Sequence, residues 1–168
     1  MITTTLDRIR EHSPCQDGWE KLLNGLGKTK ADAEPLPFAT IVKINGLDDA
    51  LWCCRVEPQY AKEWRLFAVT CARRVQHLNT DPRVKNTIDA AERYANGQAT
   101  DEELRTARNA AQAAWSATRD ATWASGDAAL AAAWASGDAA GEAAWAAAWD
   151  AEREWQKQEF LRVVTETK

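Results

Sequence analysis

Apolar residues in the first hundred positions fall at three- and four-residue spacings, the pattern of short amphipathic helices. The clearest instance is a single helix face within residues 60–78, made of Trp64, Phe67, Ala68, Cys71, Val75 and Leu78. Glycine and proline recur between such segments, where helices end and begin. Residues 1–99 are therefore expected to form a bundle of short helices.

Several helix boundaries in this bundle can be placed from local residue types. Thr4 or Thr5 can cap a first helix, and Ser13–Pro14 supplies a cap and a first-turn proline for a second helix that ends at Gly27. The segment Phe38–Ile44 is ambiguous, because its β-branched residues favour a strand. No second strand is visible to pair with it, so we predict a short helix there.

A capping box marks the start of a much longer helix. Thr100 and Glu103 can satisfy each other's free backbone amides. Helix is then compatible with the sequence as far as Val164, and residues 107–151 contain 22 alanines. These features predict a long Ala/Trp-rich helical segment over residues 100–164.

The length of this segment limits how it can fold. A continuous helix over residues 101–164 would be about 95 Å long, whereas a compact domain of this size has a radius of gyration of about 15 Å. The helix must therefore protrude, pair with a second subunit, or break. Gly126 and Gly137 are the expected break points, because glycine costs about 1 kcal/mol inside a helix.

The stretch WASGDAALAAAWASGDAAGEAAWAAAW, residues 123–149, repeats after eleven residues, which is about three helical turns. Trp123, Trp134 and Trp145 therefore lie in one stripe, with Trp149 within about 80° of Trp123. Acidic residues share this side of the helix: Asp120, Asp127, Asp138, Glu142 and Glu152. Aromatic anchors among polar groups are typical of protein-binding surfaces, although tryptophans at helical spacing also occur in ordinary cores.

Charge and composition narrow the function class. The net charge is -4, and residues 120–168 hold 4 basic against 9 acidic side chains, which argues against nucleic acid as a ligand of this segment. We find no apolar run long enough to span a membrane and no secretion signal in the first residues. The expectation is a single cytoplasmic domain of 168 residues.

Catalytic and metal-binding motifs are weak or missing. We find no P-loop, GxGxxG, HExxH or GxSxG pattern, and the four cysteines are expected to be free thiols. His12, Cys15, Cys71 and His77 could form a zinc site, but no paired CxxC accompanies them. We therefore predict no catalytic residue, cofactor or metal, with a Cys/His metal-dependent enzyme as an alternative.

Three segments, followed by the Ala/Trp-rich tail, carry a resemblance to a known family: NGLDDALWCCR (45–55), EWRLFAVTCARRVQHL (63–78) and AERYANGQATDEELRTARNAA (91–111). Over residues 45–150 the chain resembles the fifth family of polymorphic-toxin immunity proteins and its phage and prophage relatives. The resemblance implies a small all-helical protein that binds and neutralises another protein, without a catalytic residue. For a phage-borne member, the target can also be a host antiviral defence component, as for an anti-CRISPR or another anti-defence inhibitor.

These observations predict an all-α, single-domain, non-enzymatic inhibitor that sequesters a protein target, either a toxin effector or a host defence nuclease complex with a basic surface. The expected partner-binding residues are Trp134, Trp145 and Trp149 as apolar anchors, with Asp127, Asp138 and Glu142 opposing basic groups. The alternative is a structural or assembly protein that forms a homodimer through the alanine side of its long helix.

Overall fold

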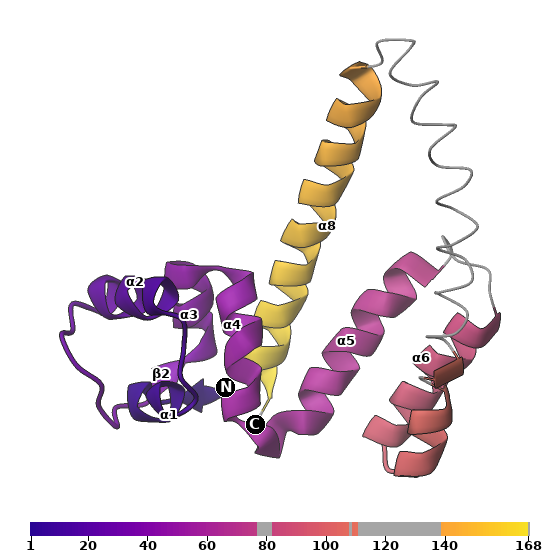
Figure 1. Cartoon of the computed structure of the whole chain (residues 1–168), viewed down its shortest axis with the longest axis horizontal. Helices are drawn as coiled ribbons and strands as arrows, with labels where there is room; N and C mark the ends of the chain where they lie inside the picture. The colour runs from indigo at the N-terminus through magenta and orange to yellow at the C-terminus, as the bar shows by residue number, and fades with distance from the viewer. Residues whose placement is uncertain (77–81, 108, 111–138, 168) are drawn as a thin grey trace. The chain divides into compact units, whose positions relative to one another are not determined.

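The computed structural model describes residues 1–76, 82–107, 109–110 and 139–167, and this part of the chain is all-α, as predicted (Figure 1). The helices are α1 (Leu6–Glu11), α2 (Gln16–Leu26), α3 (Phe38–Asn45), α4 (Leu47–Cys53), α5 (Ala61–Val75), α6 (Pro82–Ala95) and α8 (Ala139–Glu166), with residues 101–107 also helical. Two 3-10 turns, η1 (Cys54–Val56) and η2 (Pro58–Tyr60), link α4 to α5. None of the helices described combines the length and the apolar character that crossing a membrane requires.

The chain divides into two compact units. The first unit comprises Met1–Phe67 together with Glu154–Lys168, and the second comprises Ala68–Arg153. Helices α5 and α8 each contribute residues to both units. The last turns of α8, expected as the end of a tail, thus belong with the N-terminal helices.

The ends of α1 and α2 follow from residues that satisfy free backbone groups. Thr5 is the N-cap of α1, and its hydroxyl oxygen accepts a hydrogen bond from the Arg8 amide at 3.2 Å. The prediction that Ser13–Pro14 caps α2 is wrong: Ser13 has a φ of 53° and donates its amide to the Arg10 carbonyl at 3.1 Å, closing α1. Cys15 occupies the N-cap of α2, and Gly27 ends this helix in the left-handed conformation, as expected.

The ambiguous segment after residue 37 is helical, as predicted. α3 follows Pro37 and ends where Gly46 adopts a φ of 100°. A feature that the sequence did not predict precedes it: strand β1 (Thr3–Thr4) pairs antiparallel with β2 (Leu36–Pro37). Strands of two residues are too short to show the alternation by which strands are recognised.

Aromatic side chains from both ends of the chain form the core of the first unit. Phe160 and Val164 of α8 are 0% exposed. The Phe160 ring centroid lies 5.3 Å from that of Phe67, 5.9 Å from that of Trp64 and 6.3 Å from that of Phe38. The last two turns of α8 are therefore part of this core.

Backbone hydrogen bonds tie the first residues to the last turns of α8. The Ile2 amide donates to the Val164 carbonyl at 2.7 Å, and the Met1 amino group donates to the Thr167 carbonyl. The Phe38 amide in turn donates to the Ile2 carbonyl at 3.2 Å. Residues 1–2 thus lie between α3 and the end of α8.

Two neighbouring arginines at the end of α5 hold the helices of the second unit. Arg73 lies 2.5 Å from the Asp89 carboxylate and 2.6 Å from that of Glu92, both on α6, while Arg74 pairs with Glu152 of α8 at 2.8 Å. The hydrogen bonds that Arg73 donates to Glu92 and to Asp89 raise the pKa of Arg73. Charge pairing therefore contributes to this unit alongside the burial of Ile88, Ala90 and Leu104.

The predicted capping box before residue 101 is confirmed. The Thr100 amide donates to Glu103 Oε2 at 2.8 Å, and the Glu103 amide donates to Thr100 Oγ1 at 3.2 Å. The hydrogen bonds that the Thr100 amide and then the Thr100 hydroxyl donate to the Glu103 carboxylate lower the pKa of Glu103. The helix that starts here is joined to α6 by the Thr87 hydroxyl, which donates to the Ala107 carbonyl at 2.8 Å.

Candidate functional site

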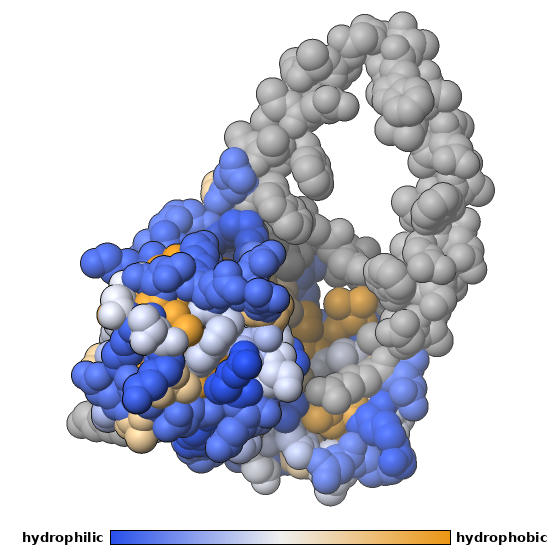
Figure 2. Space-filling view, turned by 60° about the vertical axis from the view of Figure 1, so that its left-hand side comes forward, coloured by the Kyte–Doolittle hydropathy of each residue, from blue (hydrophilic) through white to orange (hydrophobic). Residues whose placement is uncertain are grey.

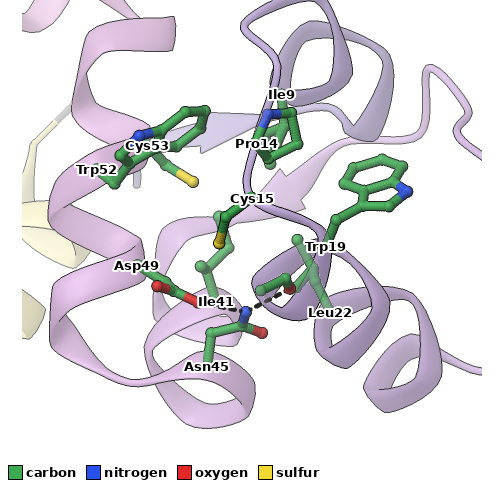
Figure 3. A pocket seen from close by; sticks show the side chains of 11 residues that line it. Ile9, Pro14, Cys15, Trp19, Leu22, Ile41, Asn45, Asp49, Trp52 and Cys53 are labelled. Atoms are coloured by element: carbon green, nitrogen blue, oxygen red, sulfur yellow. Dashed lines mark hydrogen bonds between the residues drawn. The ribbon is translucent and has the colours of Figure 1, made fainter.

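A pocket of about 60 Å³ opens in the first unit among α2, α3, α4 and the end of α1 (Figure 3). Its floor is aliphatic and consists of Ile9, Leu22 and Ile41, which are all buried. These side chains come from three different helices, so the floor exists only in the folded unit. The surface of the unit in the view of Figure 2 is mostly hydrophilic, with smaller hydrophobic areas between the polar ones.

Two tryptophans line the pocket, Trp19 from α2 and Trp52 from α4. Each indole ring also carries a guanidinium: Arg10 lies 5.5 Å from the Trp19 ring centroid, and Arg55 lies 4.7 Å from that of Trp52. Neither arginine is among the residues that line the pocket. Both indoles therefore already attract cations through their π-systems.

The polar part of the pocket is built around an amide. Asn45 donates both hydrogens of its Nδ2, to the Gly18 carbonyl at 2.8 Å and to Asp49 Oδ2 at 2.7 Å (Figure 3). A methyl group at Gly18 would lie 2.9 Å from Asp49 Oδ2 and 3.1 Å from Cys15 Sγ, so glycine lets these two groups approach the helix backbone. Within the described residues the Asp49 carboxylate has no ion-pair partner, and the neutral Asn45 amide is its hydrogen-bond donor.

The cysteines of the pocket differ in exposure. Cys15 is exposed, whereas Cys53 is buried. Burial first, and the nearby Asp49 charge second, raise the pKa of Cys53 to about 12. Burial likewise raises the pKa of Cys54 to about 12, and its thiol donates to the Ala50 carbonyl at 3.6 Å. Cys53 and Cys54 thus remain thiols at neutral pH, and nucleophilic chemistry by either of them is not favoured.

The zinc hypothesis finds no support in the part of the chain that the structure describes. There, no three His, Cys, Asp or Glu side chains gather as metal ligands. Nδ1 of His12 lies 3.0 Å from the Arg8 carbonyl oxygen. Cys71 belongs to the second unit, whereas His12 and Cys15 belong to the first, and His77 lies outside the described residues.

The predicted partner-binding residues fall into two groups. Positions 142, 145 and 149, occupied by Glu142, Trp145 and Trp149, belong to α8, whose backbone is helical throughout. Trp134, Asp127 and Asp138 lie outside the described residues, as do the expected break points Gly126 and Gly137. Glu152, an acid of the same stripe, forms the ion pair with Arg74.

A buried carboxylate that sequence reasoning missed lies in the turn between α4 and α5. Glu57 is 1% exposed, and its Oε2 accepts from Arg8 Nη1 at 2.8 Å and from Gln59 Nε2 at 2.5 Å. Its carbonyl accepts from the Trp64 indole at 3.1 Å. Arg8 also donates to the Val56 carbonyl at 2.7 Å, so these contacts fix α1 against the turn. No local sequence pattern marks Glu57 as buried.

Comparison of the chain with models of protein families, with curated proteins and with solved structures finds no match.

Proposed function

We propose that this protein is a non-enzymatic inhibitor that binds and sequesters a second protein through the tryptophan and acid side of α8. The target would be a bacterial toxin, as for the immunity proteins that the sequence resembles, or a component of a host antiviral defence system. In either case the expected target surface is basic and apolar, and neither a membrane nor nucleic acid takes part.

The observation that carries the proposal is the helical backbone of α8 from Ala139 to Glu166. At about 100° per residue, positions 142, 145, 149 and 152 fall within about 80° of one another around the helix axis. The proposed anchors Trp145 and Trp149 therefore belong to the same side of the helix as Glu142, whereas Glu152 on that side is already paired with Arg74. Such a mixture favours a partner surface with apolar hollows and basic side chains.

The anchoring of α8 adds a second argument. Phe160 and Val164 are fully buried, and Glu152 is paired with Arg74, so the C-terminal half of this helix is held in place. A helix fixed along half its length loses little further conformational entropy when the other half binds a partner. The Glu152 pair also provides an example, within the chain, of an acid of this stripe bonded to an arginine.

The test is capture of the target by the purified full chain. Proteins that co-purify with the chain from bacterial lysate are identified by mass spectrometry, and the interaction with the identified target is then measured by isothermal calorimetry. The double variant Trp145→Ala/Trp149→Ala is expected to weaken binding at least a hundredfold, because two central aromatic anchors carry much of the energy of such interfaces. Far-UV circular dichroism should remain unchanged.

The matched control changes the opposite side of the same helix. Ala147→Ser/Ala151→Ser alters positions about 120–160° away from the proposed anchors and should leave the affinity within about twofold. Glu142→Lys should weaken binding and reduce its salt dependence, since it replaces a charge that attracts a basic surface. If the double tryptophan variant binds the same target as tightly as the parent chain, α8 is not the binding surface and the proposal fails.

A further inference from the structure

The pocket of the first unit combines an unneutralised carboxylate with apolar walls. Asp49 is half-buried there, and its hydrogen bond from the neutral Asn45 amide leaves the negative charge in place. An ionised group in partly apolar surroundings is stabilised by a counter-charge, and within the described residues the chain itself supplies none to Asp49. A ligand that suits this end of the pocket is therefore a cation.

The walls suit a cation as well. Trp19 and Trp52 both line the pocket and both already hold a guanidinium, from Arg10 and Arg55 respectively. The two arginines lie outside the lining of the pocket, so they do not occupy the space beside Asp49. Aromatic faces combined with a carboxylate form the chemical environment in which proteins bind alkylammonium groups.

The size of the pocket limits which cation fits. Its volume is about 60 Å³, far below the roughly 300–1,000 Å³ of pockets that hold whole small molecules. The pocket therefore suits the end of a side chain, an ammonium group with the methylene group next to it. The aliphatic floor of Ile9, Leu22 and Ile41 suits the methylene group, and Asp49 suits the ammonium group.

We propose that this pocket binds the ammonium end of a lysine side chain presented by a protein partner. The methylene stem of the lysine would lie between Trp19 and Trp52, as the stems of long amphipathic side chains lie along apolar surface. Its ammonium group would donate a hydrogen bond to the Asp49 carboxylate. This inference rests on the proposed function in so far as the lysine comes from the sequestered protein. It places a second contact on the first unit, separate from the α8 positions.

The experiment uses the full chain and small probes, so that it needs no identified partner. n-Butylammonium chloride, a mimic of the lysine side chain, is titrated while the indole N–H signals of Trp19 and Trp52 are followed by 1H–15N correlation spectroscopy. 1-Butanol and sodium butanoate, which carry no charge and the opposite charge, are titrated in parallel at equal ionic strength. A blocked Gly-Lys-Gly peptide then presents the same ammonium group on a peptide.

Two substitutions of adjacent acids separate a specific site from general attraction. Asp49→Asn removes the charge in the pocket while its side-chain oxygen can still accept from Asn45, and Asp48→Asn removes the same charge from an exposed position outside the pocket. Binding should weaken about threefold to tenfold in the first variant and stay unchanged in the second. Gly18→Ala, which places a methyl group against Asp49 and Cys15, should abolish binding with the helix content retained.

The proposal is supported if butylammonium and the lysine peptide give saturable shifts of both indole signals with millimolar affinity, and the shifts depend on Asp49. It is overturned if no saturable shift occurs, if butanol binds as well as butylammonium, or if Asp49→Asn binds as tightly as the parent chain. The assignment of the ligand to a lysine of a protein partner is also overturned if butylammonium binds and the lysine peptide does not. None of these outcomes depends on Trp145 or Trp149, so this inference and the proposed function can fail separately.

Discussion

Replacement of Phe160 by alanine is expected to be among the most destabilising single changes in the described part of the protein. Its ring is 0% exposed and lies 5.3 to 6.3 Å, centroid to centroid, from the rings of Phe67, Trp64 and Phe38. A phenylalanine ring buries about 150–250 Å², worth about 4–6 kcal/mol as an upper estimate, and Phe→Ala changes in cores cost about 3–5 kcal/mol. A loss of this size is a large part of the stability of an ordinary domain.

Urea unfolding followed by far-UV circular dichroism measures the loss. With an m value of about 2 kcal/mol/M, a cost of about 3–5 kcal/mol lowers the urea midpoint by about 1.5–2.5 M. Glu154→Ala on the same helix is the control, because Glu154 is exposed and its change should stay within about 0.5 kcal/mol. If Phe160→Ala shifts the midpoint no more than this control does, the last turns of α8 do not belong to the core and the description of the first unit is wrong.

Three further outcomes are expected. Thr100→Ala removes the capping box and should lower the free energy of unfolding by about 1 kcal/mol, measured by urea titration against a Thr106→Ala control. With an aromatic disulfide reagent at pH 8, the exposed Cys15 thiol should react before the buried Cys53 thiol, whose pKa is raised to about 12. The variant Cys15→Ser should therefore lack the fast phase of thiol labelling. Hydrogen bonds from Lys85 and then Arg73 lower the pKa of Asp89 below its unfolded value, so the stabilisation by the Asp89 carboxylate is present above about pH 4 and is lost as the pH falls further. The variant Asp89→Asn should therefore be less stable at pH 7, and its free energy of unfolding should depend less steeply on pH in the acid range.

Local signals in the sequence predicted much of the first half of the fold. Thr5, Gly27, Thr100 and Glu103 act through their own or nearby backbone groups, so their roles can be read from the residues beside them. The error at Ser13 has the same origin: a serine before a proline suits a helix start, but here its amide is used to end the preceding helix.

The position of Phe160 and the pocket could not be predicted in this way. Phe160 meets Phe38, Trp64 and Phe67, which lie about a hundred residues earlier, and no spacing within α8 reveals these neighbours. Asp49 lies in the first turn of α4, where acidic residues are favoured, and this place says nothing of the Trp19 indole on another helix. Sites assembled from several helices depend on tertiary packing, which the pattern along one helix does not contain.

The contact between residues 1–2 and the end of α8 has a consequence for protein synthesis. A chain emerging from the ribosome presents residues 1–67 without Phe160 and Val164, because residues 68–153 are made in between. At about 5–20 residues per second this interval is of the order of ten seconds. During that time the apolar side of α3 and α5 lacks its covering helix, so chaperone binding to nascent chains should be strongest before residue 160 is exposed and should decline once it is.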